Sequence, residues 1–285
     1  MVKLLTKRLM AVVSLAITAI APNGDQKEKI LPIITLNEKG EFELEEIDLD
    51  GWKNTFRRVL VNGPPLSGKT TSFLTFPPKR HIFIAPGELG HSSVREDETT
   101  KLYYWEFDPN STNVQYMRTW VYVQRLTQEI LAGKHGEVTT FCIDGLHKLY
   151  YVIMKAMGFT SNSDPKEYVK YHEAFANYMH FVLGGPTPFV VASSYDGNEA
   201  VEAGSKVTQI FPDLPGKMAK QVMGMFPVVL HSERNGELEK ERFTWRLRAS
   251  GKIQGVGMHL PIEIKKRFPA EIDQDWRKIE AIVNE

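Results

Sequence analysis

The stretch VNGPPLSGKTTSF, which begins at Val61, has residue types and a spacing suited to holding phosphate. Residues 63–70 match G-x-x-x-x-G-K-[ST], a pattern in which backbone N–H groups wrap the phosphates of a nucleotide. We expect Lys69 to reach the β- and γ-phosphates of ATP, and the Thr70 hydroxyl to complete the shell of a Mg²⁺ ion. The sequence also predicts that the Lys69 ammonium is solvated when the site is empty. The candidate phosphate-contacting residues are Gly63, Pro64, Pro65, Leu66, Ser67, Gly68, Lys69, Thr70 and Thr71.

A second acidic group is needed to hold the metal, and Asp144 is placed to supply it. It ends the apolar run TTFCID, which reads as a buried strand. An aspartate in this position could instead cap the following helix. The next residue is Gly145 and not glutamate, so a base that activates water must come from elsewhere in the chain.

Glu88, at the end of RHIFIAPGELG, is the candidate for that base. The arrangement resembles the RecA-like ATPases, in which the catalytic glutamate follows the strand after the P-loop helix and the metal aspartate stands alone. The resemblance also implies that Ser193 or Ser194, at the end of PFVVASS, senses the γ-phosphate. The alternatives are a loop carboxylate with no catalytic role and small polar residues that simply end a strand.

The elements that must position these residues follow an alternating pattern. The apolar runs RVLV, RHIFIA, KLYYWEF, TTFCID and PFVVASS are separated by helical stretches, which predicts an α/β fold with a mainly parallel sheet flanked by helices. In the first long helical stretch, Val114, Met117 and Val121 mark one face. The later runs FPVVLHSE, RFTWRLRAS and VGMHLPIEI predict antiparallel strands at the C-terminal edge. We expect an N-terminal extension with a β-hairpin over residues 1–50 and a RecA-like domain over residues 51–285.

The wider pattern extends from about residue 57 to residue 269. NGPPLSGKTT, the lone Asp144 and FPDLPGKMAKQVMGMFPVVL are similar to the compact phage-type RecA-like ATPases, a group that includes single-strand-annealing recombinases. This resemblance implies ATP hydrolysis, single-stranded DNA as a partner, a role in recombination or annealing, and self-assembly into a ring or filament. In such assemblies a late cation reaches a neighbouring subunit's site. Lys252 is the first candidate for it and Arg248 the second, against the alternative of solvated strand residues.

The candidate DNA contacts lie in the loop over residues 196–220. Lys206, Lys217 and Lys220 could meet phosphates, and Phe211 could stack on a base. A solvated surface connection is the alternative. Two other functions stay open: a nucleotide-gated phage assembly or DNA-packaging ATPase, and a small-molecule P-loop kinase. The kinase is disfavoured because SNSDPKEYVKYHEAF lacks the arginines of a phosphate-covering lid.

Composition restricts the partners and the compartment. Lysine plus arginine and aspartate plus glutamate number 35 each, so any contact with nucleic acid must come from a local patch. The single cysteine, Cys142, excludes an intramolecular disulfide and reads as a buried apolar residue. The basic and apolar start MVKLLTKRLMAVVSLAITAIA resembles a secretory signal, but Pro22 follows it. We expect a packed segment there, no membrane association, and a cytoplasmic protein, in the host cytoplasm if phage-encoded.

Overall fold

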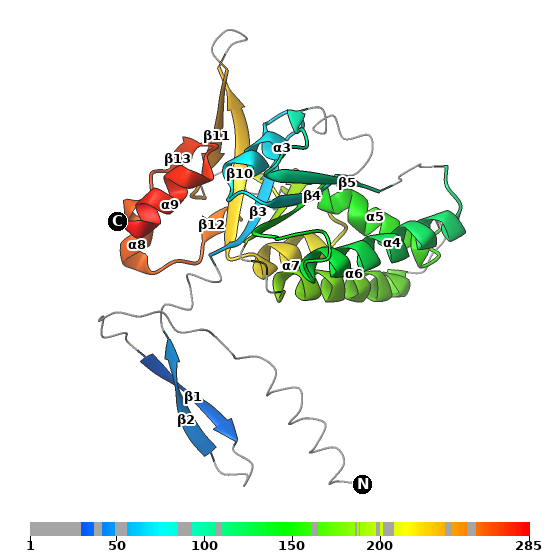
Figure 1. Cartoon of the computed structure of the whole chain (residues 1–285), viewed down its shortest axis with the longest axis horizontal. Coiled ribbons are helices and arrows are strands. Elements are labelled where there is room, and N and C mark those ends of the chain that lie inside the picture. Colours follow the sequence, from blue (N-terminus) through cyan, green and yellow to red (C-terminus); the bar gives the residue numbers. More distant parts are fainter. Residues whose placement is uncertain are drawn as a thin grey trace. The chain divides into compact units, whose positions relative to one another are not determined.

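A computed structural model describes two compact units, which comprise Met1–Gly51 and Trp52–Glu285 (Figure 1). In the first unit, β1 (Ile30–Leu36) and β2 (Phe42–Asp48) pair antiparallel, so the predicted hairpin forms. The apolar start of the chain lies outside the described residues. The structure describes residues 30–36, 42–48, 56–84, 93–105, 110–160, 165–185, 187, 189–197, 200–201, 208–236, 241–249 and 255–285.

The second unit is built on a nine-stranded sheet with the order β13-β11-β10-β3-β7-β6-β4-β5, and β12 pairs with β10. The six strands from β10 to β5 in this order are parallel, and β11, β12 and β13 are antiparallel. A mainly parallel sheet with antiparallel strands at the C-terminal edge is what the sequence predicts. The strands are β3 (Arg58–Gly63), β4 (Arg80–Ile84), β5 (Thr100–Tyr104), β6 (Thr140–Asp144), β7 (Phe189–Tyr195), β10 (Val228–Asn235), β11 (Arg242–Arg246), β12 (Gly257–Met258) and β13 (Glu271–Asp273).

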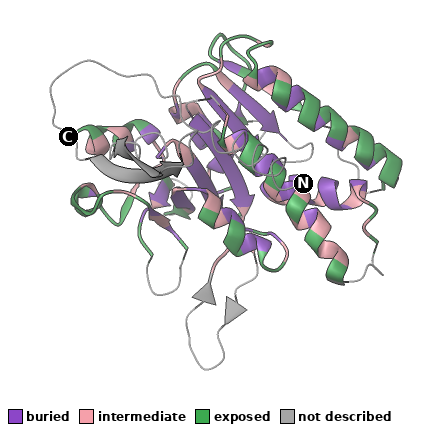
Figure 2. Cartoon of the chain, turned by 90° about the horizontal axis from the view of Figure 1, so that it is seen from below, coloured by how far each residue is buried: buried purple, intermediate pink, exposed green. Residues whose placement is uncertain are grey.

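Each face of the sheet carries its own apolar core, because successive side chains of a strand point to opposite faces. Leu60 of β3 packs with residues of α4, α5, α6 and α7, whereas Val59 and Val61 pack with residues of α9 and of the 3-10 helix that follows α3. Figure 2 shows the buried strands between these layers. The helices are α3 (Lys69–Ser72), α4 (Asn113–Leu131), α5 (Leu146–Ala156), α6 (Tyr168–Leu183), α7 (Met218–Met225), α8 (Ile262–Arg267) and α9 (Trp276–Asn284).

Two expectations about these elements are wrong. Val114, Met117 and Val121 are exposed, and the buried side of α4 carries Tyr116 and Trp120 instead. The stretch LPIEI, expected in a strand, contains the start of α8, and only two residues before it pair with the sheet. Among the described residues, no helix combines the length and the apolar character that crossing a membrane would require.

A short strand pair and two 3-10 helices complete the described elements of this unit. The P-loop helix α3 is a single turn that continues as a 3-10 helix, and a second 3-10 helix precedes α6. The macrodipole of a four-residue helix is small, so α3 by itself would add little to the attraction of an anion. These elements are β8 (Ala200–Val201), β9 (Thr208–Gln209) and the 3-10 helices Phe73–Thr75 and Pro165–Glu167.

Candidate nucleotide-binding site

The glycine-rich loop, residues 63–70, lies at the carboxyl end of β3, where open α/β sheets commonly bind ligands. It borders a cavity of about 280 Å³. Segments far apart in the sequence meet there because β3 lies between β7 and β10 in the sheet. The residues that line the cavity are 65–71, Ser93, Asp144, Gly145, His147, 193–195 and Phe243.

The predicted metal residues are in direct contact. The Thr70 hydroxyl donates to Asp144 Oδ2 at 2.7 Å, and both side chains are buried. The Ser193 hydroxyl donates to the other oxygen, Oδ1, and accepts from the backbone N–H of Gly145 at 2.9 Å. The carboxylate of Asp144 is thus oriented by one hydroxyl from the loop helix and one from the neighbouring strand β7.

This group of oxygens fits a Mg²⁺ ion. Magnesium prefers oxygen ligands and is usually held by one or two protein oxygens together with substrate phosphates and water. Thr70 and Asp144 would hold the ion at the edge of the cavity, beside the loop that faces the phosphates. A bound Mg²⁺ neutralises charge on the β- and γ-phosphate oxygens of a nucleotide.

Lys69 does not lie where the sequence led us to expect. Its side chain is buried, with 6% exposed, and not solvated. The ammonium donates to the carbonyls of Gly63 and Pro64 at 2.8 and 2.7 Å, and lies 4.6 Å from the ring centre of Tyr195. The loop's own carbonyls and an aromatic face therefore replace water around this cation.

The remaining predicted residues fall into two groups. Ser194 is buried at the cavity, but its hydroxyl donates to the Tyr195 carbonyl at 3.2 Å, and Ser193 is the serine that contacts Asp144. Glu88 and Lys252 lie outside the described residues, as does Lys206 of the candidate DNA loop. Arg248 donates to the carbonyl of Phe268 at 2.5 Å, which secures the end of α8.

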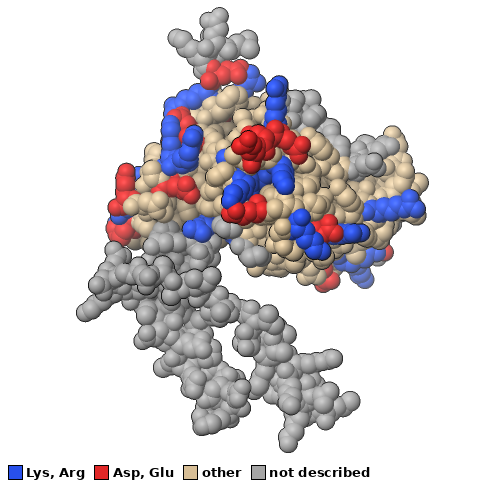
Figure 3. Space-filling model, in the orientation of Figure 1, with Lys and Arg blue, Asp and Glu red and all other residues tan. Residues whose placement is uncertain are grey.

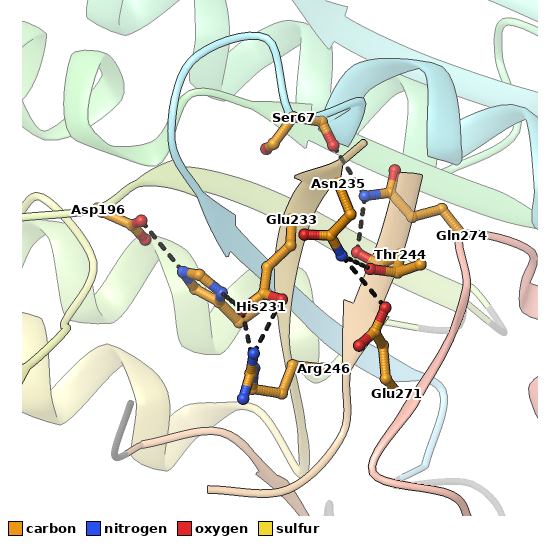
Figure 4. A network of polar contacts seen from close by, with 9 residues as sticks. All are labelled: Ser67, Asp196, His231, Glu233, Asn235, Thr244, Arg246, Glu271 and Gln274. Carbon is orange, nitrogen blue, oxygen red and sulfur yellow. Dashed lines mark hydrogen bonds and ion pairs between the residues drawn. The ribbon is translucent and has the colours of Figure 1, made fainter. Parts of the chain in front are cut away.

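Sequence reasoning missed three side chains that shape the site. Tyr195 lies between Lys69 and His147, with 4.6 Å between its ring centre and that of the histidine. Phe243 of β11 lines the cavity from the other side of β3. Gln274 follows β13, and its Nε2 donates to the carbonyls of Ser67 at 2.8 Å and Thr244 at 3.0 Å (Figure 4). Only Tyr195 had a sequence signal, because it directly follows Ser193 and Ser194 and ends β7.

A chain of polar and charged side chains, partly buried, runs along β10 beside the loop (Figure 4). His231 Nε2 lies 3.1 Å from Asp196 Oδ2, and its Nδ1 lies 3.5 Å from Glu233 Oε1. Arg246 donates to both oxygens of Glu233, at 2.8 and 3.0 Å. Burial alone would raise the pKa of Glu233, but the hydrogen bonds and charge of Arg246, with His231, hold this pKa below its usual value.

The thiol of Cys142, which lies in the same strand as Asp144, is fully buried. Burial raises the pKa of this thiol, so it stays neutral and packs as an apolar side chain. This confirms the interpretation of Cys142 as a structural residue.

The strand order and the position of the glycine-rich loop are those of an α/β fold with a mainly parallel sheet flanked by helices. No protein-family model matches the chain, and no curated protein matches it. A solved structure of a prototypical ATPase from the type III secretion system of pathogenic bacteria is similar, with a TM-score of 0.40 and 10% sequence identity. The match covers 62% of this chain and 51% of that one, so this chain spans about half of that ATPase's length.

Proposed function

We propose that this protein binds and hydrolyses ATP with Mg²⁺ and acts on single-stranded DNA in recombination or annealing. The observation that carries the nucleotide part is the contact between Thr70 and Asp144, at 2.7 Å, beside the loop that holds Lys69. A hydroxyl and a carboxylate held together at a glycine-rich loop are what a magnesium-bound nucleotide requires. Glu88 is proposed as the residue that orients the attacking water, and Ser193 or Ser194 as the contact to the γ-phosphate.

The DNA part rests on the segment after β7 and on the family resemblance; the end of this segment, which includes Lys220, is helix α7 and not the loop expected from the sequence. Lys220 Nζ lies 5.1 Å from the ring centre of Phe211, so a cation and an aromatic face adjoin there. Proteins that hold single strands without reading sequence combine such groups in a groove. Figure 3 shows Lys and Arg side chains mixed with Asp and Glu on the face displayed, which agrees with a local contact and not a broad basic field.

We propose further that the protein assembles with copies of itself and that Lys252 reaches the γ-phosphate of a neighbouring subunit. In the described part of the fold, Arg246 is bound by Glu233 and Arg248 by the Phe268 carbonyl, so both serve their own chain. Mixing tests the proposal. A Lys252→Ala subunit should be inactive alone and should regain activity with Lys69→Met subunits, which still offer Lys252. No rescue in mixtures shown to co-assemble would count against a shared site.

Binding of Mg·ATP tests the nucleotide function directly. Lys69→Met should abolish binding, Asp144→Asn should weaken it through the metal, and Glu88→Gln should leave ATP bound but not hydrolysed. Normal hydrolysis by Lys69→Met would overturn the proposal.

Binding of a labelled single-stranded oligonucleotide, measured against salt with and without ATP, tests the DNA function. Lys217→Ala and Lys220→Ala should each lower the salt dependence. ATP hydrolysis without any oligonucleotide binding would favour the assembly or packaging ATPase instead.

A further inference from the structure

The two sides of β3 differ in chemistry around the loop. On the β7 side lie Asp144 and Ser193, which are charged or polar and buried. On the β10 side the cavity is lined by Phe243, whose side chain is 37% exposed. Among the described residues of the cavity, the other aromatic groups are Tyr195 and His147, and both lie on the β7 side.

This asymmetry fixes the direction of a bound nucleotide. Thr70 and Asp144 would hold a Mg²⁺ ion, and such an ion would neutralise charge on the terminal phosphates, so these phosphates would lie near the two side chains. Because the phosphates form a chain, the nucleoside leaves the loop on the opposite side of β3. The exposed aromatic ring on that side is Phe243.

Phe243 is held close to the loop by its neighbours. A Cβ built on Gly68 would lie 3.0 Å from Cδ1 of Phe243 and 2.6 Å from Oε1 of Gln274, so both side chains touch the loop at this glycine. The backbone N–H of Gln274 donates to the Phe243 carbonyl at 3.1 Å, while its side-chain amide bonds Ser67 and Thr244. Gln274 therefore joins the strand that carries Phe243 to the loop that would carry the phosphates (Figure 4).

We propose that Phe243 is the stacking surface for the nucleobase, and that Gln274 is a positioning residue that fixes β11 against the P-loop. The ligand class is a nucleotide whose base stacks on an aromatic ring. This inference rests on the proposed nucleotide function. Stacking of a base on an aromatic side chain changes affinity about fivefold to a hundredfold.

The experiment compares a ligand that has a base with one that lacks it. Dissociation constants of Mg·ATP and of inorganic tripolyphosphate with Mg²⁺ are measured for the parent and each variant by calorimetry. Phe243→Leu should weaken Mg·ATP about fivefold to a hundredfold and leave tripolyphosphate unchanged, and Phe243→Trp should restore ATP binding. Phe181→Leu is the matched control, because Phe181 is also exposed but lies on α6.

Gln274→Ala should weaken both ligands, because the loop itself loses its support. Asn235→Ala is its control. The side-chain amide of Asn235 donates at 3.0 Å to the side chain of Thr244, which lies on β11 like Phe243, but it reaches no atom of the loop among the described contacts. Equal weakening of ATP and tripolyphosphate by Phe243→Leu would overturn the stacking assignment, as would parental affinity for both. Parental affinities in Gln274→Ala would overturn its positioning role. If the parent bound no ATP, the proposed function itself would fail.

Discussion

Gly63→Ala tests how closely the loop approaches the sheet. A Cβ at this position would lie 2.6 Å from the Ser232 carbonyl oxygen, 2.9 Å from Ser232 Cβ and 2.8 Å from Ser67 Oγ. The first contact is about 0.7 Å shorter than a close C···O approach of ~3.3 Å. Ser232 cannot move away cheaply, because it pairs with Trp245 on one side and the preceding residue pairs with β3 on the other.

The expected cost follows from this geometry. Overpacking costs about 1–3 kcal/mol, and we expect the upper end because the obstacle is backbone and not a flexible side chain. For a domain of this size, ~3 kcal/mol corresponds to a fall in Tm of roughly 6–12 °C. Nucleotide binding should weaken as well, since the carbonyl of Gly63 holds Lys69.

Thermal unfolding followed by circular dichroism measures the effect, with Gly224→Ala as the matched control. Among the described residues, a Cβ on Gly224 meets nothing within 4 Å beyond its own helix, α7. That variant should gain about 0.5–1 kcal/mol, because alanine is the better helix former. If the two alanine variants unfolded at the same temperature, the close approach of the loop to β10 would be wrong.

Three further variants probe the surroundings of the site. Glu233→Gln should lower Tm near neutral pH, and the difference in Tm from the parent should shrink as pH falls below 4.5, the usual pKa of a glutamate. The folded protein lowers the pKa of Glu233, so the stability that its ionised carboxylate contributes is fully present above pH 4.5 and is lost as pH falls through the lowered pKa. A pH-independent difference in Tm would contradict this. Trp276→Ala should lower the free energy of unfolding, measured in urea, by about 3–5 kcal/mol. Trp276→Phe should lower it much less, because an aromatic ring still packs on Phe76 and because the substitution removes a buried indole N–H that has no described partner. Leu66→Gly should raise stability by up to about 1 kcal/mol, since Leu66 is exposed and has a φ of 61°; a fall in Tm would contradict that.

Local patterns were enough to predict the loop, the strand that ends at Asp144 and the parallel sheet. Each of these depends on neighbours in the sequence: glycine spacing for the loop, and short apolar runs for buried strands. The contact of Thr70 with Asp144 followed because the loop after β3, which leads to Thr70, and Asp144 at the end of β6 lie at the same edge of the parallel sheet.

Other features depend on tertiary contacts that no local pattern carries. On α4 the apolar spacing of Val114, Met117 and Val121 competed with that of Tyr116 and Trp120, and the larger aromatic side chains were buried. The burial of Lys69 involves the loop's own carbonyls, but it also requires the ring of Tyr195, which comes from a strand distant in the sequence.

The two bonds of Gln274 could not be predicted for a similar reason. A single amide near the end of the chain has no periodicity, and its partners lie 207 and 30 residues away in the sequence. Burial and hydrogen bonding at such a distance are set by the sheet order alone.

The separation in sequence between the glycine-rich loop and Gln274 has a consequence during synthesis of the chain. Gln274 follows its partner Ser67 by 207 residues. Trp276, whose backbone N–H donates to the Thr75 hydroxyl, follows Thr75 by 201 residues. At about 5–20 residues per second, a ribosome needs roughly 10–40 s to add the segment between Ser67 and Gln274. During that time the nascent chain already contains the whole phosphate-binding loop but lacks the amide that holds it in place. The loop therefore gains this support only after the segment that carries Gln274 has been made and β11 and β13 have joined the sheet.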